Sequence, residues 1–342
     1  MRILVTGGAG YIGTPLCAHL ARRHEVVCWD PGFFGYHFTE PEPRIELVRR
    51  PVQRMTDADL VRLAPDWVLH LSGLSNDPMA DFAPRMNWRE NMEATRHVGE
   101  LTDRRAIPLV FASSASVYGY NDAAELHEDA PVSPIGYYSK SKAAAEEWLR
   151  AHHHHAVIFR QATVMGVSPR MRFDLLTNGM TKSAWTHGVL RVLYGGRETR
   201  PQVHVGDLVS AYDRVLSASP EPGTYNVASS NDSVMELARA IRDQLAVRRG
   251  KAIQLEVTDE PRVHRSYSIS SDKLRQSTGW QPRLDVAATV DELCDFLDGS
   301  GIDPEDPRWY NIRWMKLLFD AQEILRRTGP IDMTGEEAPH AE

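Results

Sequence analysis

The sequence predicts an α/β fold: a doubly wound parallel sheet with a smaller α+β lobe attached. Three observations predict it. Strand-like and helix-like segments alternate through the first half of the chain, a glycine-rich turn follows the first strand, and the alternation loosens after about Gly166. Strands that alternate with helices at this length form βαβ units and therefore a parallel sheet. Ligands of such sheets bind beyond the carboxyl ends of the strands.

The expected elements follow from short apolar segments and from apolar residues at helical spacing. The strands are Arg2–Val5, Glu25–Trp29, Ile45–Val48, Trp67–His70, Leu109–Ala112 and Ala156–Arg160. The clearest helices are Arg85–Arg104, Tyr137–Ala151, Asp207–Ser217, Val234–Leu245 and Trp309–Arg327. We expect residues 1–165 to form the sheet domain, with segments around 200–227 returning to it. Residues 166–298 then form mainly the smaller lobe, and 299–342 form a C-terminal helix and a polar tail.

The first strand runs directly into Gly7, Gly10 and Gly13, and helical spacing follows. This order is typical of a Rossmann-type dinucleotide site, where backbone N–H groups and the helix dipole favour a pyrophosphate. The three-residue steps differ from Gly-x-Gly-x-x-Gly and are typical of short-chain dehydrogenase/reductases. The alternative interpretation is a glycine-rich turn that binds no ligand.

The second strand ends in an acid at the distance that a dinucleotide site requires. Asp30 follows Glu25–Trp29, and its carboxylate can accept hydrogen bonds from both ribose hydroxyls of an adenosine. The same carboxylate repels a 2′-phosphate, and no Arg or Lys lies between Asp30 and Glu42. The sequence therefore predicts NAD rather than NADP.

The composition of the 342 residues is that of an ordinary globular chain, 42% hydrophobic and 25% charged. The net charge of −7 does not favour nucleic-acid binding, and no apolar segment approaches a membrane span. The three cysteines, Cys17, Cys28 and Cys294, lack metal-ligand spacing. The first strand begins at residue 2, which leaves no room for a signal peptide before it. We expect a cytoplasmic protein with reduced thiols, without a metal site, and with neither nucleic-acid nor membrane partners.

A candidate catalytic set lies later in the same half of the chain. Tyr138 and Lys142 form Tyr-x-x-x-Lys, so they share one face of a helix, and a nearby ammonium lowers the pKa of a phenol. Such a phenol can act as a general base or acid. Ser114 ends a buried strand and can hydrogen-bond the substrate oxygen whose proton Tyr138 handles. Taken alone, Tyr-x-x-x-Lys also arises by chance as an exposed aromatic and a solvated lysine.

Together these pieces resemble the extended short-chain dehydrogenase/reductases, specifically the NAD-dependent nucleotide-sugar epimerase/dehydratase family, over about residues 1 to 297. The matching segments are Thr-Gly-Gly-Ala-Gly-Tyr-Ile-Gly at 6–13, Asp30, His70-Leu-Ser-Gly73, Asn91-Met-Glu-Ala-Thr95, Ser113-Ser-Ala-Ser-Val-Tyr-Gly119, Tyr138-Ser-Lys-Ser-Lys142 followed by Glu146, Thr199-Arg-Pro-Gln-Val-His-Val-Gly-Asp207 and Tyr225-Asn-Val227.

The resemblance implies roles for individual residues. Catalysis falls to Ser114, Tyr138 and Lys142. The cofactor-binding residues are Gly7, Gly10, Tyr11, Ile12, Gly13, Asp30, Leu71, Ser72, Gly73, Asn91, Tyr138 and Lys142. The substrate-binding residues are Ser75, Ser114, Thr163, Arg172, Asn178, Arg200 and Arg265, with Arg170 and Arg262 as further candidates. For each arginine, a solvated surface charge is the alternative. The resemblance also implies a homodimer through helices Arg85–Arg104 and Tyr137–Ala151.

The family shares a first step, in which the tyrosine takes a proton from a sugar hydroxyl while a hydride leaves the same carbon. The resemblance implies that dehydratases of this family carry Asp-Glu directly after the strand-end residue. It implies that the decarboxylases carry Glu at the second of these two positions. Here the two positions are Ala115 and Ser116, which can act as neither acid nor base. The resemblance is strongest to 4-epimerases, which work through a transient 4-keto sugar. Decarboxylation of a nucleotide-uronic acid, net oxidation or reduction of a nucleotide sugar, and a non-catalytic NAD-binding regulator remain alternatives.

Two departures from the family pattern fall in the binding regions. The usual Gly-Asp after the third strand is absent, and Arg49-Arg50-Pro51-Val52-Gln53 occupies that place. The Asn common after the sixth strand is replaced within Arg160–Gly166, where Thr163 takes its position. Because that position lies near substrate in family members, these changes indicate an unusual sugar or an altered activity.

Overall fold

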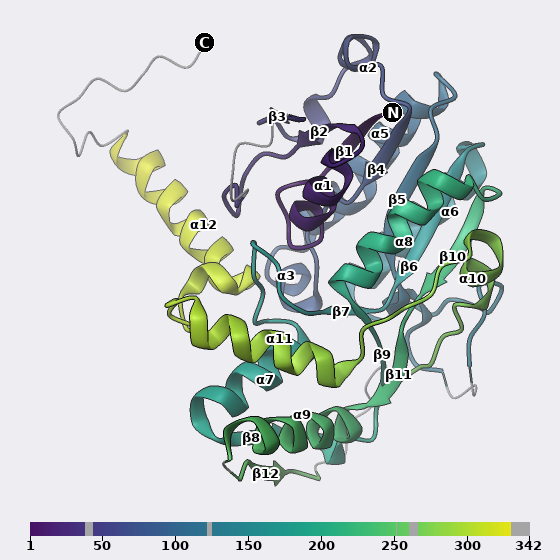
Figure 1. The fold of residues 1–342 in the computed structure, drawn as a ribbon. Coiled ribbons are helices and arrows are strands. Elements are labelled where there is room, and N and C mark those ends of the chain that lie inside the picture. Colours follow the sequence, from purple (N-terminus) through teal and green to yellow (C-terminus); the bar gives the residue numbers. More distant parts are fainter. Residues whose placement is uncertain (38–43, 122–124, 251, 260–265, 330–342) are drawn as a thin grey trace.

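The computed structural model describes residues 1–342 except 38–43, 122–124, 251, 260–265 and 330–342 (Figure 1). Its centre is a seven-stranded sheet in the order β10-β6-β5-β4-β1-β2-β3, in which every neighbouring pair is parallel. The strands are β1 (Arg2–Thr6), β2 (Glu25–Trp29), β3 (Ile45–Val48), β4 (Trp67–His70), β5 (Leu109–Ser114), β6 (Ala156–Gln161) and β10 (Gly223–Val227). The predicted α/β fold is confirmed, and β10 is a strand that the sequence analysis did not expect.

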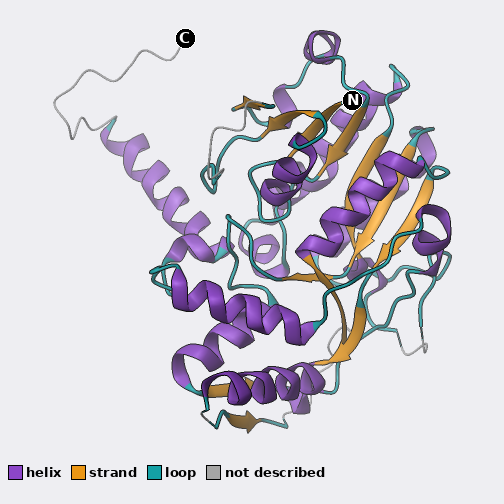
Figure 2. Ribbon diagram, in the orientation of Figure 1, coloured by secondary structure: helices purple, strands orange, loops and turns teal. Residues whose placement is uncertain are grey.

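Alternate side chains of the strands build two apolar layers, one on each face of the sheet. Helices cover both faces (Figure 2). One layer packs Ile3 and Val26 against α1 (Gly13–Ala21) and α8 (Val205–Ala218). The other packs Leu4 and Val27 against α2 (Asp57–Leu63), α5 (Ala94–Asp103) and α6 (Tyr137–His152). Because both faces are covered, the strands are apolar at successive positions, as parallel strands usually are.

The helix expected over Arg85–Arg104 is divided into three parts. It consists of α4 (Pro84–Trp88), a π-helical turn over Arg89–Glu93 (η2) and α5. The short α3 (Asp77–Phe82) precedes it. The π-helical turn carries Asn91, whose side chain is fully buried. Turns of this type often occur at functional sites, and this one lies beside the loop that follows β4.

The remaining elements form the smaller lobe and the connections. One small sheet contains β7 (Thr163–Met165), β9 (Thr199–His204) and β11 (Ser230–Ser233), and another pairs β8 (Val189–Val192) with β12 (Gln254–Val257). The helices are α7 (Leu176–His187), α9 (Val234–Arg249), α10 (Asp272–Thr278), α11 (Val286–Gly299) and α12 (Asn311–Thr328). Short 3₁₀ turns are η1 (Val52–Arg54), η3 (Ala115–Tyr118), η4 (Tyr194–Gly196) and η5 (Pro307–Trp309). Within the described residues, no helix combines the length and apolar character needed to cross a bilayer.

Two features of this arrangement position the site. β2 and β4 flank β1 on opposite sides, so the sheet changes winding direction at β1, where open α/β sheets bind their ligands. At this point the smaller lobe is hydrogen-bonded to Tyr11, which lies in the turn after β1. The Tyr11 hydroxyl donates to the Gly166 carbonyl at 2.7 Å, and Ser168 Oγ donates to the Tyr11 carbonyl at 2.7 Å.

Candidate active site

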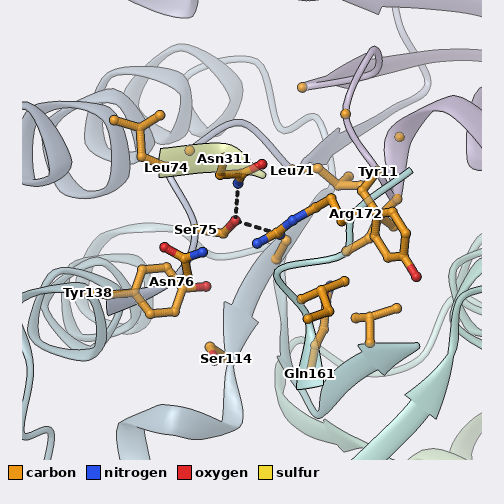
Figure 3. A pocket seen from close by; sticks show the side chains of 18 of the residues that line it. Tyr11, Leu71, Leu74, Ser75, Asn76, Ser114, Tyr138, Gln161, Arg172 and Asn311 are labelled. Atoms are coloured by element: carbon orange, nitrogen blue, oxygen red, sulfur yellow. Dashed lines mark hydrogen bonds between the residues drawn. The ribbon is translucent and has the colours of Figure 1, made fainter. Parts of the chain in front are cut away.

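A cavity of about 370 Å³ lies at the carboxyl ends of the central strands, between the sheet and the smaller lobe (Figure 3). This volume is within the range of small-molecule sites. Most of the residues expected at the site line it. They are Gly7, Gly10, Tyr11, Ile12, Gly13, Asp30, Leu71, Ser72, Gly73, Ser75, Ser114, Tyr138, Lys142, Thr163, Arg172 and Arg200.

The glycine turn brings backbone to backbone at distances that side chains would prevent. Gly7 has φ +72°, and a Cβ there would lie 2.7 Å from the amide nitrogen of Ser72. A Cβ on Gly13 would lie 2.3 Å from the carbonyl oxygen of Gly7. At the start of α1, Ile12 supplies no side-chain cap and the first turn carries no acid. The N–H groups of this turn are therefore suited to an anionic ligand such as a pyrophosphate.

Asp30 is held in place at the end of β2. Its carboxylate accepts from the amide of Gly32 at 2.7 Å and from that of Ala9 at 3.2 Å. Burial raises the pKa of Asp30, and these two bonds and the charge of Arg170 oppose the shift. Two features of the cleft therefore fit NAD. The glycine turn suits the pyrophosphate, and the fixed Asp30 carboxylate suits the ribose.

Residues 31–42 contain no Arg or Lys, as the sequence analysis noted, but the fold brings a cation to Asp30 from elsewhere. Arg170 of the smaller lobe lies in electrostatic range of the Asp30 carboxylate. An interaction between residues 140 positions apart leaves no local signal in the sequence.

The three candidate catalytic residues meet in the cavity from two elements. Ser114 ends β5, and Tyr138 and Lys142 lie one turn apart on α6. Figure 3 shows the side chains of Ser114 and Tyr138 near one another on one side of the cavity. The ammonium of Lys142 donates to the Ala112 carbonyl at 2.8 Å and lies 4.7 Å from the centroid of the Phe111 ring.

Burial controls the protonation of this pair. It lowers the pKa of Lys142 to about 7, with the charge of Glu146 acting in the opposite direction. It raises the pKa of Tyr138, and a hydrogen bond with Ser114 and the charge of Arg172 only partly offset the rise. The net shift of the Tyr138 pKa is therefore upward, opposite to the direction expected from the ammonium alone.

A polar network also lines the cavity, and Figure 3 shows part of it, the hydrogen bonds of Ser75 with Arg172 and Asn311. Arg172 donates to both carboxylate oxygens of Asp174, at 2.8 and 3.0 Å, and to Ser75 Oγ at 2.8 Å. Asn76 donates to Asp174 at 2.9 Å. Asn311, the first residue of α12, donates to Ser75 Oγ at 3.2 Å. This network fixes the Arg172 guanidinium, with its charge paired, at the cavity wall.

Three expected contact residues are not among those that line the cavity. Asn91 is fully buried behind it, where its amide bonds both backbone groups of Leu74 and the hydroxyl of Ser141. Asn178 is equally buried and bonds the backbone of Gly166, the Tyr11 hydroxyl and the Arg172 carbonyl. Both therefore support the walls of the cavity rather than forming its surface. Arg265, like Arg262, lies outside the described residues.

The cavity also contains residues that the sequence analysis did not assign to it. They include Phe33, Phe34, Asp174, Gln161, Tyr267 and Asn311. Asp174 lies two residues after Arg172, so its position gave a local signal. Asn311 gave none, because it belongs to a C-terminal helix beyond the matching segments.

The parallel sheet, the glycine turn, the fixed carboxylate after β2 and the Ser–Tyr–Lys set in one cleft define a dinucleotide-binding protein of the extended short-chain dehydrogenase/reductase class. Residues 3–228 match the model of the NAD dependent epimerase/dehydratase family, and the chain belongs to that family. Its cofactor is NAD.

The comparisons with individual proteins show several reactions among the relatives. The chain is 27% identical over 321 residues to a UDP-glucose 4-epimerase of Mycolicibacterium smegmatis, covering 87% of this chain and 98% of that one. It is 29% identical over 357 residues to a dTDP-glucose 4,6-dehydratase of Mycobacterium tuberculosis, covering 94% and 98%. The structure of a dTDP-glucose 4,6-dehydratase from Bacillus anthracis in complex with NAD shares the fold, with a TM-score of 0.75 at 20% identity over 92% of this chain and 99% of that one.

Proposed function

We propose that this protein is an NAD-dependent nucleotide-sugar 4-epimerase that acts through a transient 4-keto intermediate. The glycine turn and Asp30 would hold NAD, which would supply a reversible hydride acceptor for C4 of the sugar. Tyr138 takes the proton of the 4-hydroxyl and gives it back, while Ser114 hydrogen-bonds the same oxygen. Lys142, when protonated, supplies positive charge that favours the phenolate of Tyr138. Rotation of the keto sugar between the two transfers inverts the configuration at C4.

The observation that carries the proposal is the chemistry available directly after Ser114. Elimination of water or loss of carbon dioxide requires a group that moves an additional proton or holds an additional charge. Ala115 and Ser116 occupy the positions where the resemblance places acids in dehydratases and decarboxylases. Ser116 lines the cavity, and its hydroxyl has a pKa too high for acid–base work near neutral pH. A redox-neutral epimerisation needs no further acid or base there.

Substrate contacts follow from the same cavity. We assign the nucleotide sugar to the side lined by Ser75, Thr163, Arg172 and Arg200. Burial lowers the pKa of Arg200, with Tyr267 and Glu198 opposing. An anionic diphosphate beside Arg200 would offset the free-energy cost of burying its guanidinium. The arginines therefore suit a nucleoside diphosphate. Arg265 stays a proposed diphosphate contact, and Asn178 becomes a positioning residue.

The organisation of the molecule is part of the proposal. We assign residues 1–165 with 200–227 to the NAD-binding domain, 166–298 mainly to the substrate lobe, and 299–342 to a C-terminal helix and tail. A homodimer through α4, α5 and α6 accounts for the exposed aromatic side chains of Trp88 and Tyr137 on those helices. Cys17, Cys28 and Cys294 are thiols rather than disulfides, in keeping with a cytoplasmic location.

The test is incubation of the purified protein with a panel of UDP-, dTDP- and GDP-sugars and uronic acids. Products are followed by NMR and reduced cofactor by absorbance. We expect formation of a C4 epimer without net NADH. We expect Tyr138→Phe to reduce turnover by about 10²–10⁴-fold, since it removes the acid–base group, while NAD still binds.

Other products would indicate other reactions. Release of carbon dioxide would indicate a decarboxylase, and a 4-keto-6-deoxy product would indicate a dehydratase. Stoichiometric NADH would indicate net oxidation of the nucleotide sugar. Undiminished turnover by Tyr138→Phe would show that the base lies elsewhere. Binding of NAD without turnover of any sugar in the panel would favour the non-catalytic regulator.

A further inference from the structure

The C-terminal segment beyond the family match reaches the cofactor cleft. The Phe173 amide donates to the carbonyl of Trp309 at 3.0 Å, and the Asn311 amide donates to Asp174 at 3.2 Å. Farther along α12, the indole N–H of Trp314 donates to the Phe33 carbonyl at 2.6 Å. The base of α12 is thus bonded both to the smaller lobe and to the loop that follows β2, while its far end extends away from the body (Figure 1).

Arg170 is a buried cation at this junction. Its side chain is 2% exposed, and its guanidinium lies 4.1 Å from the centroid of the Phe34 ring. It donates to Asn311 Oδ1 at 2.6 Å and to the Met171 carbonyl at 3.4 Å, and both acceptors are uncharged. Arg172, by contrast, forms a two-point ion pair with Asp174.

The lowered pKa of Arg170 reflects the free-energy cost of burying its charge. Burial and the charge of Arg172 lower the pKa of Arg170 to about 9, although Asp174, Asp30 and Tyr11 act in the opposite direction. A guanidinium buried against neutral acceptors is costly unless an anion joins it. Because Arg170 lines the cavity, a ligand can supply that anion.

Arg170 lies in the part of the cleft that is suited to a dinucleotide. Its side chain lies against the loop after β2 through Phe34, and in electrostatic range of Tyr11 in the glycine turn and of Asp30. Ser168, two residues before it, bonds the Tyr11 carbonyl and holds this segment on the glycine turn. The pyrophosphate of a dinucleotide belongs between a ribose-binding acid and the N-terminus of α1.

We propose that Arg170, oriented by Asn311 of the C-terminal helix, binds the pyrophosphate of NAD and that the C-terminal segment thereby completes the cofactor site. Arg170 is then a cofactor-binding residue and Asn311 a positioning residue. Asn311 also donates to Ser75 Oγ, so the same side chain joins the cofactor half of the cleft to the substrate half. The proposal rests on the family's use of NAD and is independent of which sugar reaction follows.

The test measures binding without turnover, by calorimetry on protein stripped of cofactor. Arg170→Met keeps the apolar stem and removes the charge. We expect it to weaken NAD binding by about 10–100-fold, the range for a lost charged hydrogen bond. The dependence of NAD affinity on salt should become shallower. Asn311→Ala should weaken NAD binding in the same direction but less, and it should add little in the double variant because both act on one contact.

Two controls make the outcomes distinct. Arg313→Met removes an exposed arginine from the same helix and should leave NAD affinity within about twofold. UDP binding should be unchanged in Arg170→Met. Unchanged NAD affinity in Arg170→Met would overturn the proposal. If UDP affinity were lost at the same time, Arg170 would instead bind the diphosphate of the nucleotide sugar. Circular dichroism checks folding, and Arg170→Lys, which keeps the charge, should bind NAD more tightly than Arg170→Met.

Discussion

At the residue scale, Lys142 places its ammonium in a buried site where burial lowers its pKa to about 7. The unfolded chain holds this proton up to a pKa near 10.4. Between these two values the unfolded state binds more protons, so stability rises with pH across that window. Below about pH 7 the folded protein carries the full cost of a buried charge.

Lys142→Met removes this cost. We expect the cofactor-free variant to unfold at a temperature about 2–4 °C higher than the parent at pH 6, with the difference shrinking as the pH rises toward 10. Thermal unfolding followed by circular dichroism across this range measures it. Lys140→Met, an exposed neighbour on α6, should show neither the gain nor its pH dependence. A gain that grows with pH would mean that the ammonium is not buried as described.

Several of the predicted residues that the structure places in the cavity have a local signature in the sequence. Asp30, Tyr138 and Lys142 each lie at a fixed spacing from an element, so the element carries them into the cleft. Arg170 and Asn311 are 141 positions apart, and only the fold brings them together. A contact of this kind depends on the packing of the lobes, which no short pattern encodes.

At the element scale, the turn between β1 and α1 depends on Gly13 more than on Gly10. A Cβ at Gly13 meets the Gly7 carbonyl and the Gly8 Cα at 2.3 and 2.6 Å, so backbone must move. A Cβ at Gly10 meets only the Gly7 carbonyl, at 3.2 Å. The two glycines therefore contribute differently to the turn: Gly13 to its packing, and Gly10 mainly to its surface toward the cavity.

We expect Gly13→Ala to lower the free energy of unfolding by about 1–3 kcal/mol and to abolish NAD binding, because overpacking displaces the turn. Gly10→Ala should cost less than about 1 kcal/mol. Urea unfolding and NAD calorimetry measure the two effects. Gly299→Ala, at a helical glycine with open space around it, is the matched control and should be neutral or slightly stabilising. Equal losses at positions 10 and 13 would contradict this account of the turn.

The elements themselves were predicted to different degrees, for physical reasons. The six expected strands are all present, since buried parallel strands are continuous apolar segments. β10 was missed because its sequence, Gly-Thr-Tyr-Asn-Val, contains polar residues whose burial is compensated by tertiary contacts, such as that of Asn226 with the Tyr118 hydroxyl. The π-helical turn at Asn91 was missed because its signal is a buried amide network rather than a change in apolar spacing.

At the scale of the whole molecule, the candidate active-site cavity lies between the two lobes. Contacts from Tyr11 to Gly166 and from Asn311 to Ser75 join them on either side of it. A cavity between the two lobes suits the proposed epimerisation, which must hold its keto intermediate near the cofactor until the hydride returns. Ser116, which lines the cavity, and its neighbour Ala115 can act as neither acid nor base, which supports the proposed return of the hydride to the carbon that it left.

The most direct test of that central claim follows a deuterium label at C4 of the nucleotide sugar that the protein turns over. In ordinary water, we expect the product to be the C4 epimer with the deuterium still at C4 and no reduced cofactor in solution. NMR and mass spectrometry of the product measure both. Deuterium found at C6 or in free reduced cofactor, or a product that has lost its carboxyl carbon, would contradict the epimerase.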